Sequence, residues 1–152
     1  MRHLWKVPLY CLIASWVYWH VEIHLLARFA VIKGPDGSLS SNTAASMMIA
    51  GILFLAVIAV GGLVFFRRIT RRALFCSATV MVALNAVFGT IAVQMNSPFW
   101  AKFSEWSRIV ERLFYYLPLH PWIGTVAAWC APYLFLLFGT QPTKDGNGLQ
   151  AD

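Results

Sequence analysis

The sequence predicts an all-α, polytopic membrane protein with four transmembrane helices and one amphipathic interfacial helix between the third and the fourth. Of the 152 residues, 59% are hydrophobic and 12% are charged, whereas ordinary soluble domains carry about 25% charged residues. Residues 44–66 and 73–95 contain no charged side chain, and about 20 apolar residues suffice to cross the hydrocarbon layer. A link with four arginines, residues 67–72 (RRITRR), separates these two runs.

The arginine link predicts the orientation of the chain. Short loops rich in lysine and arginine remain in the cytoplasm. We therefore expect a multi-pass protein of the cell membrane, in a bacterial inner membrane, with both termini cytoplasmic. The net charge of +6 comes mostly from this link, so topology explains it and no nucleic-acid partner is expected.

The remaining segments form a single domain, residues 1–152, around these two spans. The first span is expected at about residues 7–32 and the fourth at about residues 122–139. At 1.5 Å per residue the first would extend about 39 Å, which exceeds the ~30 Å hydrocarbon layer. Its outer end should therefore tilt or emerge among the headgroups. Residues 140–152 are polar and are expected to be a disordered tail.

Residues 98–117 have the periodicity of an amphipathic helix. Apolar side chains recur at steps of three and four residues, and charged side chains occupy the other side. This pattern is typical of a helix lying in the membrane interface. It predicts either a strap that joins two spans, or a lid or a docking surface for a partner on the outer face. The interface residues would be Trp100, Trp106, Arg108 and Arg112.

The first span carries the one constellation that could support chemistry. His20, His24 and Arg28 are four residues apart and therefore share one face of a helix. Glu22 lies about 200° away from His20 and shares the opposite face with Ser15 and Tyr18. The helix should thus present two polar stripes to two different neighbours.

Three interpretations of these residues remain open. His20 and His24 could bind zinc with His120 as a third ligand, since Glu22 points away from them. Alternatively, Glu22 could handle ions or protons with His20, His24 and Asn85, because an ionisable residue inside a span suggests function. The structural alternative places His20–Arg28 in the headgroup zone, or pairs Glu22 with Arg108 or Arg112.

The chain lacks the patterns that hydrolytic or nucleotide-binding enzymes require. It contains no phosphate-binding glycine loop and no second carboxylate within a span. We expect no enzymatic activity and no cofactor. Asn85, in the middle of the third span, should bond to a neighbouring helix.

The favoured function is protein–protein interaction in the lipid bilayer, with another membrane protein or a second copy. The chain would act as an accessory or regulatory subunit or as an immunity-type protein. The alternative is a small transporter or an ion- or proton-handling protein that uses Glu22, His20 and His24.

Overall fold

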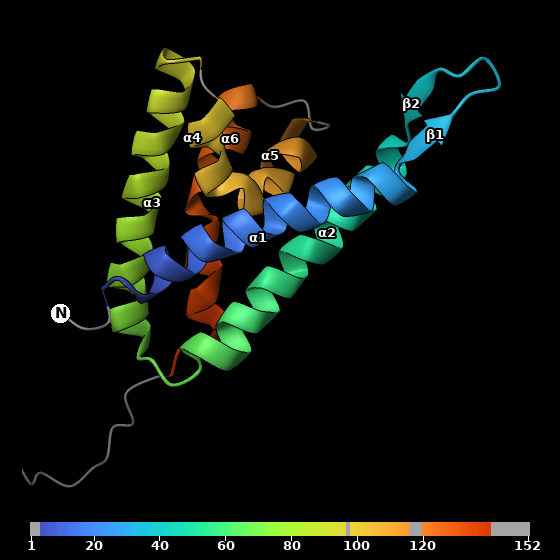
Figure 1. The fold of residues 1–152 in the computed structure, drawn as a ribbon. Helices are drawn as coiled ribbons and strands as arrows, with labels where there is room; N and C mark the ends of the chain where they lie inside the picture. Colours follow the sequence, from blue (N-terminus) through green and yellow to red (C-terminus); the bar gives the residue numbers. More distant parts are fainter. Residues whose placement is uncertain (1–3, 97, 116–119, 141–152) are drawn as a thin grey trace, which may run out of the picture.

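Three long helices dominate the structure. The computed structural model describes residues 4–96, 98–115 and 120–140. The helices are α1 (Lys6–Phe29), α2 (Thr43–Val60) with its π-helical continuation η1 (Gly61–Phe66), and α3 (Arg71–Gln94) (Figure 1). Each of the three is long and apolar enough to cross a membrane. They correspond to the first three predicted spans, although α1 ends three residues before the predicted boundary at residue 32.

A β-hairpin replaces the end of the first predicted span. Strand β1 (Val31–Lys33) pairs antiparallel with β2 (Leu39–Ser41), and the hairpin projects beyond the ends of α1 and α2 in Figure 1. Gly37 adopts φ +80° in the turn, a conformation that glycine reaches without a steric clash. The carboxylate of Asp36 accepts hydrogen bonds from the hydroxyl of Ser38 at 2.6 Å and from its N–H at 3.1 Å. These bonds lower the pKa of Asp36.

The arginine link is tied to the end of the last helix. The Thr140 N–H donates to the carbonyl of Ile69, and the Arg71 N–H donates to the carbonyl of Thr140, both at 3.0 Å. Thr70 caps α3, since its hydroxyl accepts from the Ala73 N–H. Thr140, predicted as the start of a disordered tail, is therefore held in place. Residues 141–152 lie outside the described part of the chain.

The predicted amphipathic helix is not continuous. It is built from three pieces: α4 (Pro98–Ala101), the 3-10 segment η2 (Lys102–Ser107) and α5 (Arg108–Tyr115). The backbone leaves helical geometry at Ser104, where φ is −117° and ψ is 15°. The break allows the segment to turn into the bundle. There Trp106 is fully buried and stacks on Phe54 of α2, with ring centroids 5.6 Å apart.

The fourth predicted span is a helix of two types. α6 (Pro121–Cys130) is α-helical, and η3 (Ala131–Phe138) continues it as a 3-10 helix. The change falls at Pro132, which has no backbone N–H to donate to the preceding turn. The apolar helix Trp122–Phe138 has fewer residues than the other three.

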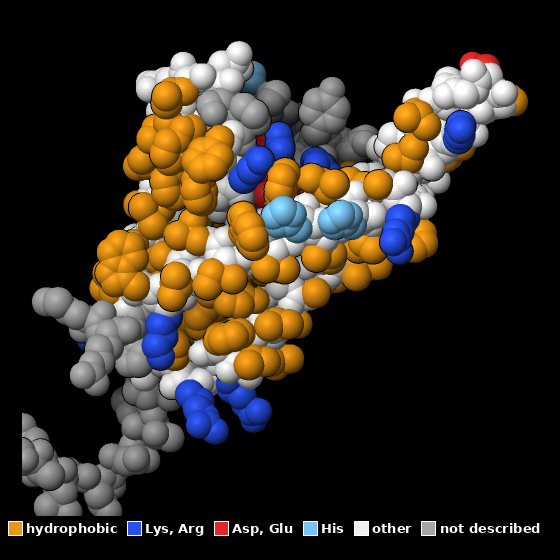
Figure 2. All heavy atoms as spheres, viewed as in Figure 1, with side chains coloured by type: hydrophobic (Ala, Val, Ile, Leu, Met, Phe, Trp, Pro, Cys, Tyr) orange, Lys and Arg blue, Asp and Glu red, His pale blue; other side chains and the backbone are white. Residues whose placement is uncertain are grey.

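The helices pack in an oblique arrangement. In Figure 1, α1 and α2 lie side by side and α1 crosses α3 at a steep angle, while η2 and η3 contact α1 and α3. The buried core joins the helices through side chains that include Val7, Cys11, Phe66, Met81 and Phe135. The outer surface of the described helices is covered with large apolar side chains (Figure 2). Such a surface is compatible with a membrane protein, because lipid replaces water as its neighbour.

Candidate functional site

The inward face of α1 carries three buried polar side chains. Ser15, Tyr18 and Glu22 are between 1% and 4% exposed. The hydroxyl of Ser15 donates to the carbonyl of Phe103 at 2.8 Å, and that of Tyr18 donates to the carbonyl of Ala50 at 3.3 Å. The helical spacing correctly predicted that Glu22 shares its face with Ser15 and Tyr18.

Glu22 forms an ion pair with Arg112 of α5. The Arg112 Nη1 donates to the Glu22 Oε1 at 3.1 Å. The Glu22 side chain is 5% exposed and that of Arg112 is 36% exposed. A buried carboxylate needs such a partner, because an isolated charge away from water is strongly unfavourable. The pairing with a basic residue of segment 98–117, one of the alternatives predicted from sequence, is present.

The acidic residues of the broken segment also have partners. Arg108 Nη1 lies 3.1 Å and 3.2 Å from the two carboxylate oxygens of Glu105. The hydroxyl of Thr125 on α6 donates to Glu111 at 2.9 Å. Together with Glu22–Arg112, these contacts form a polar layer that joins α1, η2, α5 and α6. This layer fixes the broken segment in place.

The outward face of α1 carries the histidines. His20, His24 and Arg28 are all exposed, and Figure 2 shows the histidine side chains on the outer surface of α1. Indole rings flank His20 on its own helix, since the ring centroids of Trp16 and Trp19 lie 4.6 Å and 4.7 Å from the imidazole. We call His20, His24 and Arg28 the histidine stripe.

The structure does not assemble the predicted zinc site. His20, His24 and His120 are described, and no group of three or more His, Cys, Asp or Glu side chains in the described ranges could hold a metal ion. His120 precedes α6 as its N-cap residue. The spacing within α1 brings two histidines to one face but does not bring the third ligand to them.

Asn85 lies fully buried between α3 and α6. Its Nδ2 donates to the carbonyl of Trp129 at 3.2 Å, which is the bond to a neighbouring helix that the sequence predicted. Its Oδ1 is buried without a hydrogen-bond partner among the described residues. No hydrogen bond among the described residues joins Asn85 to the polar layer around Glu22.

The four residues of the predicted docking surface do not form one exposed surface. Trp106 is fully buried against Phe54 and Phe135, so it cannot contact a partner. Arg112 is engaged by Glu22, and Trp100 is half-buried beside Phe88. Only Arg108 of the four is exposed, at 50% of its side chain. The periodicity identified the apolar stripe correctly, but that stripe is covered by the protein itself.

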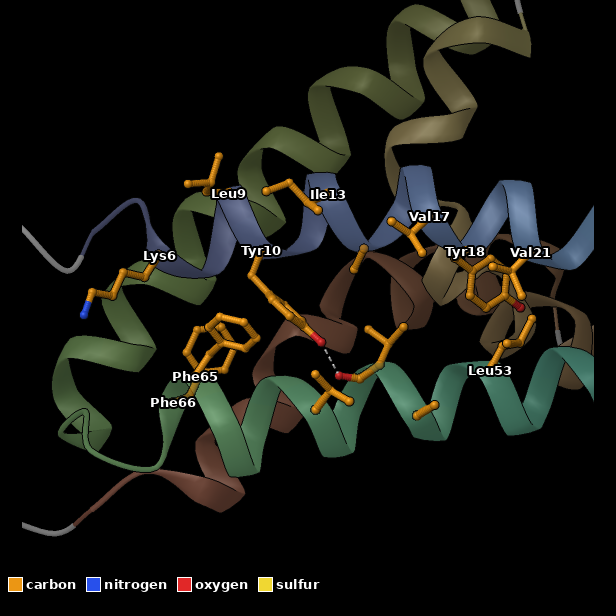
Figure 3. A pocket seen from close by; sticks show the side chains of 14 residues that line it. Lys6, Leu9, Tyr10, Ile13, Val17, Tyr18, Val21, Leu53, Phe65 and Phe66 are labelled. Atoms are coloured by element: carbon orange, nitrogen blue, oxygen red, sulfur yellow. Dashed lines mark hydrogen bonds between the residues drawn. The ribbon is translucent and has the colours of Figure 1, made fainter.

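An apolar groove between α1 and α2 was not predicted. It has a volume of about 610 Å³, and Tyr10, Ala14 and Tyr18 form part of its α1 wall (Figure 3). The spacing of these three residues, four apart on one face, is the signal in the sequence. The spacing alone could not show that the face would border a groove.

The fold and the site define a helical chain with three helices that are long and apolar enough to cross a membrane, and with a buried ion pair between α1 and α5. No protein-family model matches the chain, and no curated protein and no solved structure match it either.

Proposed function

We propose that this chain is a small integral membrane protein with four spans that acts by binding another membrane protein and does not catalyse a reaction. Its role would be that of an accessory or regulatory subunit, or of an immunity-type protein. The observation that supports this proposal is the contrast between the two faces of α1. Glu22 finds its partner within the chain, whereas the histidine stripe faces outward.

The length of the last helix supports the proposed fourth span. A 3-10 helix rises about 2.0 Å per residue and an α-helix about 1.5 Å. Ten residues of α6 and eight of η3 therefore reach about 31 Å, close to the ~30 Å hydrocarbon thickness. With the arginine link on the cytoplasmic side of a bacterial inner membrane, both termini are cytoplasmic and the broken segment from α4 to α5 lies near the outer interface.

The position of the histidine stripe on α1 supports a protein partner. The 24 residues of α1 end at Phe29, so His20 and His24 lie about 14 Å and 8 Å along the axis from that end. Ionisable side chains within a membrane span almost always face the bundle interior or a water-filled cavity rather than lipid. A protein partner that covers the exposed stripe would meet this requirement.

The surroundings of the stripe indicate the chemistry of the partner. The Lys102 Nζ lies 3.8 Å from the centre of the Trp19 ring, and Arg108 is half-exposed nearby on the same broken segment. Figure 2 shows basic side chains beside the histidine-bearing part of α1. A face of imidazoles and cations is complementary to a membrane helix that carries an acidic side chain.

The alternative function, ion or proton handling through Glu22, has less support. The carboxylate of Glu22 is held at 3.1 Å by Arg112 and is 5% exposed. The groove beside α1 is lined by apolar side chains apart from Lys6 and the two tyrosines. Transport would require Glu22 to leave its arginine during each cycle.

Site-specific photocrosslinking in native membranes tests the proposal. A photoreactive residue at Ile23, an exposed position between the two histidines, should give one dominant protein adduct. The same residue at Phe75, an exposed position on α3, is the matched control. The captured protein, purified and reconstituted with this chain, should bind at least tenfold more weakly to the His20→Leu/His24→Leu variant and should require its own acidic residue. Equal adducts at both positions, or binding that is insensitive to both changes, would contradict the proposal.

A further inference from the structure

The groove between α1 and α2 is a hollow in the apolar surface that has a charged residue at one end. Its described lining comes from α1 and from the α2–η1 helix, and its volume is about 610 Å³, within the ~300–1,000 Å³ range of small-molecule sites. Lys6 is the only charged residue in that lining. In Figure 3, Lys6 lies at one end of the groove, next to Phe65 and Phe66.

The tyrosines of the groove present their rings rather than their hydroxyl groups. The hydroxyl of Tyr10 donates to the carbonyl of Val57 at 2.7 Å, and that of Tyr18 donates to the carbonyl of Ala50. Both bonds link α1 to α2, and Figure 3 shows the one from Tyr10 to Val57. The surface offered to a ligand is therefore apolar along almost its whole length.

Two further basic residues follow the groove lining in the chain. Phe65 and Phe66 line the groove, and the exposed Arg67 and Arg68 follow them directly in the chain. The start of α1 is bonded to the first part of α3, which follows the arginine link. The hydroxyl of Ser77 accepts a hydrogen bond from the Val7 N–H at 3.1 Å. Ser77 is six residues, or about 9 Å, along α3 from Arg71, the first residue of that helix. Lys6 lies in the groove lining, and Arg67 and Arg68 directly follow two residues of that lining in the chain.

We propose that this groove binds an anionic lipid, with an acyl chain between α1 and α2 and the headgroup at Lys6, Arg67 and Arg68. From Lys6 to Val21 the groove follows α1 for about 22 Å, longer than one ~15 Å leaflet of the hydrocarbon layer. Basic pockets between transmembrane helices are known to hold anionic headgroups. The charge complementarity does not depend on which side of the membrane the link occupies.

The walls of the groove favour an acyl chain over a second helix. Helices associate closely in lipid where small residues line the contact. Here bulky side chains dominate the wall, including Leu9, Ile13, Val17 and Leu53, and alanine is the only small residue type in the described lining. A flexible chain can follow such an irregular surface, whereas the closest approach of helices in lipid is favoured by small residues.

Native mass spectrometry of the full chain in micelles tests this inference. The probe is an equimolar mixture of phosphatidylglycerol and phosphatidylcholine with identical tails. We expect preferential retention of phosphatidylglycerol, falling on the order of fivefold for each basic side chain removed in Lys6→Gln and Arg67→Gln. The matched control is Arg72→Gln, which removes an exposed arginine from α3.

A second variant separates the tail from the headgroup. Ala56→Phe fills the groove and should reduce retention of both lipids, whereas Val64→Phe, at a 71% exposed position outside the groove lining, should not. Equal retention of the two lipids by the wild type, or no effect of Lys6→Gln and Arg67→Gln, overturns the inference. A protein adduct from a photoreactive residue at Ala56, in place of a lipid adduct, would also overturn it and assign the groove to a partner helix.

Discussion

The ion pair between Glu22 and Arg112 predicts an asymmetric cost of mutation. The two side chains meet at 3.1 Å, but the Glu22 side chain is 5% exposed and that of Arg112 is 36% exposed. Removing the arginine leaves a carboxylate without access to water. Removing the charge of Glu22 leaves a long cationic side chain that can still reach the surface.

The magnitudes follow from this difference in burial. Breaking a buried pair by removing one partner costs about 3–5 kcal/mol, and we expect Arg112→Leu to approach that range. Glu22→Gln keeps an amide in the site and should cost about 1–2 kcal/mol, the range for a lost hydrogen bond to a group that can still be solvated. The double variant contains neither charge, so the coupling between the two changes should be about 2–3 kcal/mol.

The assay is denaturant unfolding in micelles, carried out as a double-mutant cycle. Arg72→Leu, which removes an exposed arginine at the start of α3, is the control and should change the free energy of unfolding by less than ~0.5 kcal/mol. Equal losses for Arg112→Leu and Glu22→Gln, or strictly additive losses in the double variant, would refute the reasoning.

Three further predictions concern packing and topology. Gly61→Ala should lower the free energy of unfolding by about 1–3 kcal/mol, because its Cβ would lie 2.6 Å from the ring of the fully buried Phe135. Gly51→Ala is the control and should not lower it, because nothing lies within 4 Å of the new Cβ. Similar losses for the two variants in a thermal unfolding assay would be inconsistent with this packing. Asn85→Leu should change stability by less than ~1 kcal/mol in the same assay, because it removes one bond across helices together with a carbonyl oxygen that is buried without a partner; a loss of several kcal/mol would point to a further bond. In a variant without native cysteines, a cysteine at Ser38 should react with an impermeant maleimide outside intact cells, while one at Arg68 should react only after permeabilisation; the reverse pattern would invert the proposed topology.

Local features of the sequence determined the long helices. A run of apolar residues forms a helix in lipid because every backbone group must find its partner within the segment, and this requirement depends on composition rather than on neighbours. The 100° step of the helix separated Glu22 from His20 and His24, and the structure confirms that these residues face opposite ways. The interhelical bond of Asn85 was predictable for a similar reason, because its side-chain amide cannot be satisfied by its own helix.

Only the tertiary structure decided how these helices meet. The break at Ser104 allows Trp106 to stack on Phe54, which lies more than 50 positions away in the chain. The periodicity of residues 98–117 could not predict that contact. The same holds for the choice of Arg112 as the partner of Glu22 and for the groove between α1 and α2, since both arise from the crossing of separate helices. Helical faces are set by bonds over three or four residues, whereas the neighbour of each face is set by packing between distant segments.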